Sequence, residues 1–191
     1  MKLIDSPVIQ FTSLVLLALP CVILAWGWRS NSLESEIRYE YLIIAGRTRK
    51  WRTVIPHSAT TPMPVVFAFH GVGDDMEGMA SYSGLDQLAV QSGFLLVYPS
   101  TENPDYGIWN IDNSGSNFDM EFFDRMLNAL RAKYDIDRSR VYCIGMSQGA
   151  SFVHLLATKR ANKIAAVVMH SGFLSRFEAG ENSCPMMLIA G

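Results

Sequence analysis

A single serine lies in a sequence pattern that is typical of covalent acyl transfer. Residues 145–149 read Gly-Met-Ser-Gln-Gly, so that Ser147 stands between two glycines in the spacing G-x-S-x-G. A strand-like run leads into this pattern and an amphipathic segment leads out of it. That order predicts a nucleophile elbow, in which Gly145 and Gly149 leave room where a Cβ would collide with a neighbouring strand or helix. An ordinary strand-to-helix turn is the alternative.

A second pattern predicts where the negative charge of such a reaction is held. The short apolar run VVFAF ends at His70-Gly71-Val72-Gly73. A serine elbow uses one backbone N–H from the residue after the nucleophile, here Gln148, and another from the loop after this strand. We expect the second oxyanion donor among Gly71, Val72 and Gly73. His70 is interpreted as a structural residue that fixes the loop.

No histidine of the chain has the sequence position expected of a general base, which follows the nucleophile after an Asp or Glu. His154 is on the same predicted helix as Ser147, about 10 Å along its axis and out of reach of the hydroxyl. His170 is the histidine that could approach Ser147, although a strand end is not the expected place for a base. Asp74 and Asp75 are interpreted as solvated loop residues, because carboxylates beside an oxyanion hole would oppose its charge.

Two aromatic residues are candidates for a substrate pocket. The stretch 100–117 is rich in Asn, Asp, Gly and Ser, and loops of that length in compact domains are often functional. Tyr106 and Trp109 lie in this stretch and could line an acyl or aryl pocket. Packing of the loop is the alternative role for both.

The residues around these motifs alternate between strand-like and helix-like patterns. Short apolar runs predict buried strands, and apolar residues at helical spacing predict the helices between them. The predicted strands are 37–45, 51–55, 65–69, 94–98, 140–144, 164–169 and 186–190, and the predicted helices are 85–91, 119–134 (with Asp119 as N-cap) and 148–160. The first two strands meet at Gly46 as a hairpin. This order predicts an α/β fold with a mostly parallel, doubly wound sheet.

Composition limits the classes of partner. The chain has 191 residues, of which 49% are hydrophobic and 18% are charged, as in a single globular or membrane-associated domain. Its net charge of −2 provides no basic field for nucleic acid. The 3 cysteines are interpreted as independent thiols, with one disulfide as the alternative. There is no C-x-x-C pair and no histidine cluster, so neither a metal nor another cofactor is predicted.

The N-terminus has the pattern of an export segment. Residues 11–28 are apolar and uncharged, with Lys2 before them and Arg29 after them. A secretory signal peptide and a transmembrane anchor of roughly 20 apolar residues share this pattern, and a buried core helix is a third alternative. We slightly favour a signal peptide, and expect residues 1–30 to export a domain of residues 31–191. The domain is then secreted, or extracytoplasmic and anchored to the membrane.

Taken in order, these motifs resemble the secreted polyhydroxybutyrate depolymerase and feruloyl esterase family of the α/β-hydrolase fold. The resemblance covers residues 38–191 and rests on RKWR, PVVFAFHG, GFLLVYP, Trp109-Asn110, and the run from Tyr134 into the serine motif. It implies hydrolysis of a small-molecule or polymeric ester through an acyl-enzyme on Ser147, without a cofactor.

The chain also departs from the family pattern. Gln148 stands where the family often has Asn or Ala, Ala150 where it often has Gly, and Phe118 replaces an acidic residue. In the family, the catalytic Asp follows the strand that matches 186–190, and the His comes later. Because the chain stops at Gly191, we expect a fragment or a degenerate copy that lacks the last strand and helix. A vestigial, non-catalytic ester- or carbohydrate-binding module is therefore an alternative, and a serine peptidase or thioesterase is a third.

Overall fold

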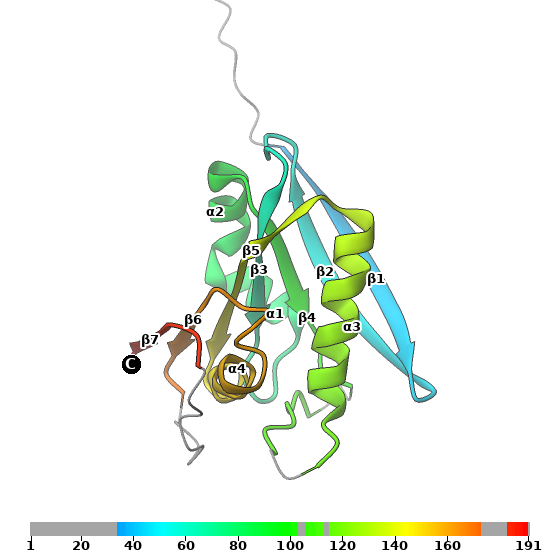
Figure 1. The fold of residues 1–191 in the computed structure, drawn as a ribbon, viewed down its shortest axis with the longest axis vertical. Helices are drawn as coiled ribbons and strands as arrows, with labels where there is room; N and C mark the ends of the chain where they lie inside the picture. The colour runs from blue at the N-terminus through cyan, green and yellow to red at the C-terminus, as the bar shows by residue number, and fades with distance from the viewer. Residues whose placement is uncertain (1–33, 103–105, 113–114, 173–182, 191) are drawn as a thin grey trace, which may run out of the picture. The chain divides into compact units, whose positions relative to one another are not determined.

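The computed structural model describes residues 34–102, 106–112, 115–172 and 183–190, which form a seven-stranded sheet in the order β1-β2-β4-β3-β5-β6-β7 (Figure 1). The strands are β1 Ser35–Ile44, β2 Arg47–Pro56, β3 Met63–Phe69, β4 Leu95–Pro99, β5 Ile136–Met146, β6 Ala166–His170 and β7 Met186–Ile189. The helices are α1 Met76–Ser83, α2 Leu85–Ser92, α3 Phe118–Lys133 and α4 Gln148–Lys159. Strands β3 to β7 pair in parallel, which confirms the predicted α/β class with a mostly parallel sheet.

The first two strands form the predicted hairpin. β1 pairs with β2 in antiparallel register from Ser35 opposite Pro56 to Ile44 opposite Arg47. The turn consists of Ala45 and Gly46, with φ of 49° and 78°, as a two-residue hairpin turn that follows the twist of the strands requires. β2 also pairs with β4 in antiparallel direction and thereby joins the hairpin to the parallel part of the sheet.

Helices cover both faces of the sheet, as a doubly wound fold requires. The larger buried cluster includes side chains of α3 and α4, and the smaller one includes side chains of α1 and α2. Figure 1 shows α3 and α4 on the viewer's side of the sheet and α2 behind it. The larger cluster is rich in aromatic rings, among them Phe67, Phe69, Phe122, Phe123 and Phe152. Its rings come from β3, α3 and α4 and lie where these two helices pack on the sheet.

Helix α1 is absent from the sequence prediction. Its first turn is capped by Asp75, whose carboxylate accepts hydrogen bonds from the N–H groups of Glu77 and Gly78 at 2.9 Å. Asp74 accepts a hydrogen bond from the Tyr82 hydroxyl at 3.0 Å. Both acids lie in the partly exposed loop before α1, as interpreted, and each also forms a side-chain hydrogen bond with that helix. The helix is short and buries only one side chain among its own residues, so its apolar periodicity is too weak to read.

The start of α3 also differs from the prediction. Asn117, rather than Asp119, is the N-cap, because its side chain accepts hydrogen bonds from the N–H groups of Asp119 and Met120 at 3.0 Å. The Asp119 carboxylate turns instead to the guanidinium of Arg49, 2.6 Å away. Both side chains of that ion pair are buried. The residue that resembled a cap is thus part of a buried ion pair between the helix and β2.

Two sequence predictions extend into residues that the structure does not describe. The apolar segment 11–28 lies outside the described residues, and within those residues no helix is long and apolar enough to cross a membrane. Cys143 and Cys184 are buried free thiols, and burial raises the pKa of the Cys143 thiol. Cys21, which lies in the apolar segment, is likewise outside the described part.

Candidate active site

Ser147 lies at the turn between β5 and α4 with a backbone conformation that is rare for serine. Its φ is 53° and its ψ is −117°, so it occupies the left-handed side of the conformational map without being glycine. A non-glycine residue in such a region costs about 1–3 kcal/mol and persists only when its surroundings hold it. Here the Ser147 N–H donates to the carbonyl oxygen of His170 at 2.9 Å, and the Ser147 carbonyl accepts from the N–H of Ala150 at 3.0 Å. The turn is thereby held by β6 on one side and by α4 on the other.

The two glycines of the serine motif lie where no side chain would fit. A Cβ on Gly145 would stand 2.3 Å from the carbonyl oxygen of Gly149. A Cβ on Gly149 would stand 2.4 Å from the carbonyl oxygens of Phe69 and His70, at the end of β3. Since these neighbours are backbone atoms, they cannot swing away. The first turn of α4 therefore packs directly on the strand that leads to the predicted oxyanion loop.

The loop after β3 lies beside the serine. A Cβ built on Gly71 would be 3.4 Å from the Cβ of Ser147, which places the backbone of the loop in contact distance of Ser147. The Gly73 N–H is already used, because it donates to the carbonyl oxygen of Tyr106 at 3.1 Å. Gly71 and Val72 therefore remain the candidate donors of this loop. Val72 has 58% of its surface exposed, so its side chain does not hold the loop down.

His70 is buried completely and acts on the backbone of the same loop. Its Nδ1 is 2.8 Å from the carbonyl oxygen of Gly71, an arrangement in which Nδ1 carries the proton and donates. Among the described residues its Nε2 has no hydrogen-bond partner. Burial lowers the pKa of this imidazole, which favours the neutral ring. These contacts support its interpretation as a structural histidine.

Trp109 is buried, with only 1% of its surface exposed. Its ring stacks on Phe152 at a centroid distance of 5.2 Å and meets Phe69 edge-on at the same distance. These contacts support loop packing, one of the two roles predicted for Trp109, and the other role stays a prediction. Tyr106 is 65% exposed, so its assignment to a substrate pocket stays a prediction.

The loop that carries Trp109 is bound to α4, β3 and α3. The Gln148 side chain accepts from the Trp109 N–H at 2.9 Å and donates to the Trp109 carbonyl at 3.3 Å. The Trp109 indole N–H donates to the His70 carbonyl at 3.0 Å. On the far side, the Asn110 N–H donates to the carboxylate of Asp119 at 2.6 Å.

The sequence reasoning missed two supports of this loop, Gln148 through its side chain and the buried pair of Arg49 and Asp119. Of these two supports, only the pair of Arg49 and Asp119 left a signal in the sequence. Arg49 is two positions from Trp51, so both project to the same face of β2, and a charge on an apolar strand face needs a buried partner. The Gln148 contact joins residues 39 apart and leaves no local signal.

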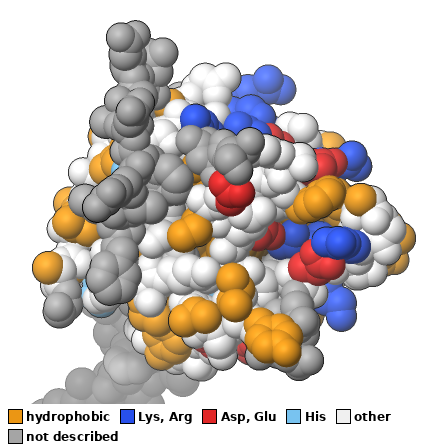
Figure 2. Space-filling view, turned by 90° about the horizontal axis from the view of Figure 1, so that it is seen from below, with side chains coloured by type: hydrophobic (Ala, Val, Ile, Leu, Met, Phe, Trp, Pro, Cys, Tyr) orange, Lys and Arg blue, Asp and Glu red, His pale blue; other side chains and the backbone are white. Residues whose placement is uncertain are grey.

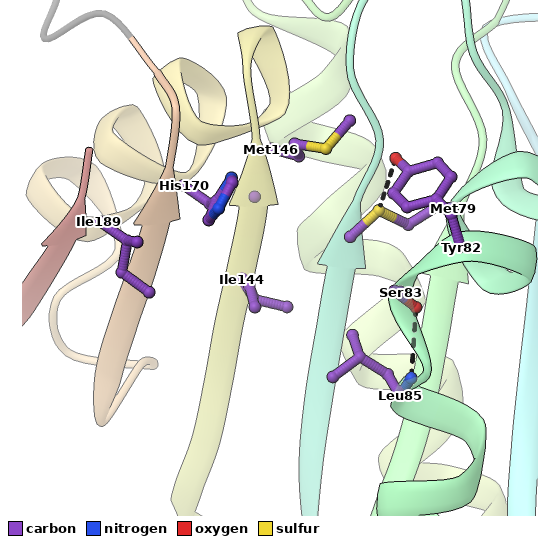
Figure 3. A pocket seen from close by; sticks show the side chains of 9 residues that line it. Met79, Tyr82, Ser83, Leu85, Ile144, Met146, His170 and Ile189 are labelled. Carbon is purple, nitrogen blue, oxygen red and sulfur yellow. Dashed lines mark hydrogen bonds between the residues drawn. The ribbon is translucent and has the colours of Figure 1, made fainter. Parts of the chain in front are cut away.

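The two histidines after Ser147 differ in their surroundings. His154 is buried on α4, where burial lowers its pKa. His170 is exposed at the end of β6, and its Nδ1 is 3.0 Å from the hydroxyl of Ser171. Figure 3 shows its ring at the rim of an apolar cavity of about 240 Å³, which Met146 and Tyr82 also line. His170 is thus beside the serine turn but on the α1 side of the sheet.

Figure 2 views the molecule from below Figure 1, and therefore from the carboxyl ends of the parallel strands. Hydrophobic side chains are spread over much of this face, whereas Lys, Arg, Asp and Glu side chains gather on its right-hand side. Val72, Tyr106 and Ile108 are exposed apolar residues of the two loops beside the serine. Among the described residues, no group of three or more His, Cys, Asp or Glu side chains could hold a metal ion.

Comparison with known sequences decides the family. Residues 52–187, well over half of the chain, match the family described as Esterase PHB depolymerase. The chain belongs to the PHB depolymerase esterases. Feruloyl esterase B of Neurospora crassa is 30% identical over 136 residues, which are 69% of this chain and 46% of that protein. A bifunctional acetylxylan esterase/xylanase of Neocallimastix patriciarum is 28% identical over 155 residues, 77% of this chain and 22% of that protein.

A solved structure shares the fold of this PHB depolymerase family member. The acetyl xylan esterase from Aspergillus awamori matches with a TM-score of 0.61 at 23% sequence identity, covering 71% of this chain and 52% of that one. At this identity the likeness concerns the α/β-hydrolase fold alone. The chain spans less than half the length of the two curated relatives named above.

Proposed function

We propose that this chain is the nucleophile-bearing part of a serine carboxylic-ester hydrolase that works through an acyl-enzyme on Ser147. One observation carries the proposal: a serine with positive φ at a strand-to-helix turn, with the Gly71 backbone packed against it. Such a turn exposes the hydroxyl beside backbone N–H donors and the positive end of a helix. Ser171 also has a positive φ, of 50°, so Ser147 is distinguished by its place between β5 and α4 beside Gly71.

In the proposed reaction, the Ser147 oxygen attacks the ester carbonyl and gives its proton to a general base. The carbonyl oxygen becomes an oxyanion, which accepts hydrogen bonds from the N–H of Gln148 and from Gly71 or Val72. Collapse of the tetrahedral intermediate expels the alcohol, which takes the proton back from the base. Water then attacks the acyl-enzyme in the same way, releasing the carboxylic acid and restoring Ser147.

The general base and the carboxylate that orients it are assigned to parts of the protein that the structure does not describe. Among the described residues after Ser147 there is no Asp or Glu. The incomplete set also motivates a second candidate, a vestigial module that keeps the ester-binding loops but does not turn over. The first candidate predicts covalent labelling of Ser147, whereas the second predicts binding without labelling.

The relatives suggest the class of substrate. Their names describe a feruloyl esterase and an acetylxylan esterase, so the proposed substrate is a carboxylic ester on a small molecule or a polymer. The exposed apolar residues beside Ser147, Tyr106 among them, suit the uncharged part of such an ester. Export by residues 11–28 belongs to the same proposal and rests on the sequence alone.

The proposal is tested by incubating the full chain with a fluorophosphonate probe and with p-nitrophenyl acetate, beside Ser147→Ala. Any labelling and any release of p-nitrophenol by the unaltered chain should vanish in Ser147→Ala, and turnover would make His170, the histidine beside the serine turn, the leading general base. Ser81→Ala, at an exposed helical serine, is the matched control and should change neither signal. Labelling that survives in Ser147→Ala would assign the nucleophile elsewhere, and a folded chain without any labelling would indicate that Ser147 has no general base here, as in a fragment or in the vestigial module.

A further inference from the structure

The side chain of Gln148, the residue after the proposed nucleophile, contacts a loop that is 39 residues away in the sequence. Its amide forms two hydrogen bonds with one backbone unit, accepting from the N–H of Trp109 and donating to its carbonyl. A carboxamide is suited to this pairing because it carries an acceptor and a donor side by side. Two bonds to one residue fix the orientation of the 106–110 loop against the start of α4, whereas a single bond would allow the loop to rotate about it.

The same loop is joined to the oxyanion loop at three places. The Trp109 indole N–H donates to the His70 carbonyl, and the Tyr106 carbonyl accepts from the Gly73 N–H. Between these bonds the backbones are in close contact, since a Cβ on Gly107 would lie 2.5 Å from the Asp74 carbonyl oxygen. The 106–110 loop therefore bridges α4 and the loop that follows β3.

This bridge connects the two predicted oxyanion donors through one residue. The Gln148 N–H is the donor at the start of α4, and the Gln148 side chain holds the bridge that positions the donor loop after β3. His70 continues the connection, because its Nδ1–H donates to the Gly71 carbonyl. A shift of the bridge would therefore change the separation of the two donors, on which the strength of an oxyanion hole depends.

Resting on the proposed function, we infer that the Gln148 side chain is a positioning residue that sets the geometry of the oxyanion hole through Trp109 and His70. Removing its amide should leave the fold intact and lower turnover more than substrate affinity. Its action is indirect: the side chain contacts the loop and not the ester.

The first experiment measures amide hydrogen exchange at Trp109 and Gly73 in the full chain and in Gln148→Met, which keeps the length of the side chain without its amide. Exchange at Trp109 should become on the order of 10-fold faster, and Gly73 should follow, because the bridge opens locally. Gln148→Glu can still accept from the Trp109 N–H, so its exchange rate at Trp109 should lie between those of the unaltered chain and Gln148→Met. Gln91→Met makes the same change at an exposed helical glutamine and should alter neither amide. Unchanged exchange in Gln148→Met would overturn the inference.

The second experiment measures kcat and KM for a p-nitrophenyl ester in the same variants. Gln148→Met should lower kcat on the order of 10- to 100-fold with KM nearly unchanged, because the donors are misplaced in the transition state. Trp109→Phe removes the bond to His70 and should give a loss that is not additive with that of Gln148→Met. Faster exchange with kcat equal to that of Gln91→Met would overturn the catalytic role. If the unaltered chain neither turns over nor labels, Ser147 has no general base here, and the exchange data alone decide whether Gln148 holds the bridge.

Discussion

At the carboxyl edge of the sheet, the described parts of the loops that follow β3, β4 and β5 are bound to one another, whereas the described residues at the ends of β6 and β7 are exposed. On the first side, His70 and Trp109 are buried and the strained Ser147 turn is fixed by backbone contacts. On the second side, His170 is exposed, and Met187 and Leu188 show 60% and 53% of their surface. The two regions are neighbours in the sheet, because β5 pairs directly with β6.

The difference suggests how the strain at Ser147 is maintained. Close packing of backbone on backbone, as between Gly149 and the end of β3, leaves the turn no alternative conformation. The Ser147 turn also uses one group of β6, the His170 carbonyl, which accepts a hydrogen bond from the Ser147 N–H. The proposed nucleophile and its proposed oxyanion donors are therefore ordered mainly by the fixed side, with one carbonyl from β6, and substitutions on the two sides should have very different costs.

The largest effect is expected where the fixed side contains a buried charge. Arg49→Met should lower the free energy of unfolding by about 3–5 kcal/mol, because it leaves the Asp119 carboxylate buried without its partner. Urea denaturation of the chain measures this difference. Arg125→Met removes the exposed partner of Glu121 on the same helix as Asp119 and should cost only about 0.5 kcal/mol or less. Similar losses in the two variants would contradict the buried role of Arg49.

A second test adds a methyl group to the serine turn. Gly149→Ala should destabilise the chain by about 3 kcal/mol, since the new Cβ meets two carbonyl oxygens of the β3 end. Gly46→Ala is the control, because Gly46 has a positive φ of 78° but no atom within 4 Å of the position that a Cβ would take. It should cost about 1 kcal/mol from backbone strain alone. Equal midpoints of denaturation would show that the elbow has room that the structure does not indicate.

The third prediction concerns pH. Because burial lowers the pKa of His70 in the folded chain, the unfolded chain binds a proton more readily below the ordinary pKa of about 6.5. Stability should therefore fall as the pH is lowered through 6.5 toward the folded pKa, by at most about 1.4 kcal/mol per pH unit for this one group. In His70→Gln the pH dependence of the urea midpoint should be shallower. Burial also lowers the pKa of His154, so His154→Gln should remove a separate part of the pH dependence of stability. A slope unchanged in both variants would assign the dependence to carboxylates.

The contrast between the two sides also explains what the sequence predicts well. Apolar runs such as that of β3 indicate the central strands, since a strand buried on both faces must be apolar throughout. The G-x-S-x-G motif between a strand and a helix locates the serine for a similar local reason. Helix α1 and the cap at Asn117 escape prediction, because each depends on a side-chain bond rather than on periodicity. The pairing of Gln148 with Trp109 is a tertiary contact, and the sequence around either residue contains no trace of it.

The smallest effect is expected on the open side, and it tests whether that side is open in solution. Met187→Lys on β7 should change the free energy of unfolding by no more than about 0.5 kcal/mol, as for other exposed positions. Met169→Lys, on the adjacent strand, buries the same charge at a site that is 3% exposed and should prevent stable folding. The two variants differ only in which side chains surround the lysine, so denaturation midpoints compare them directly. A large loss in Met187→Lys would mean that other atoms cover this face in solution.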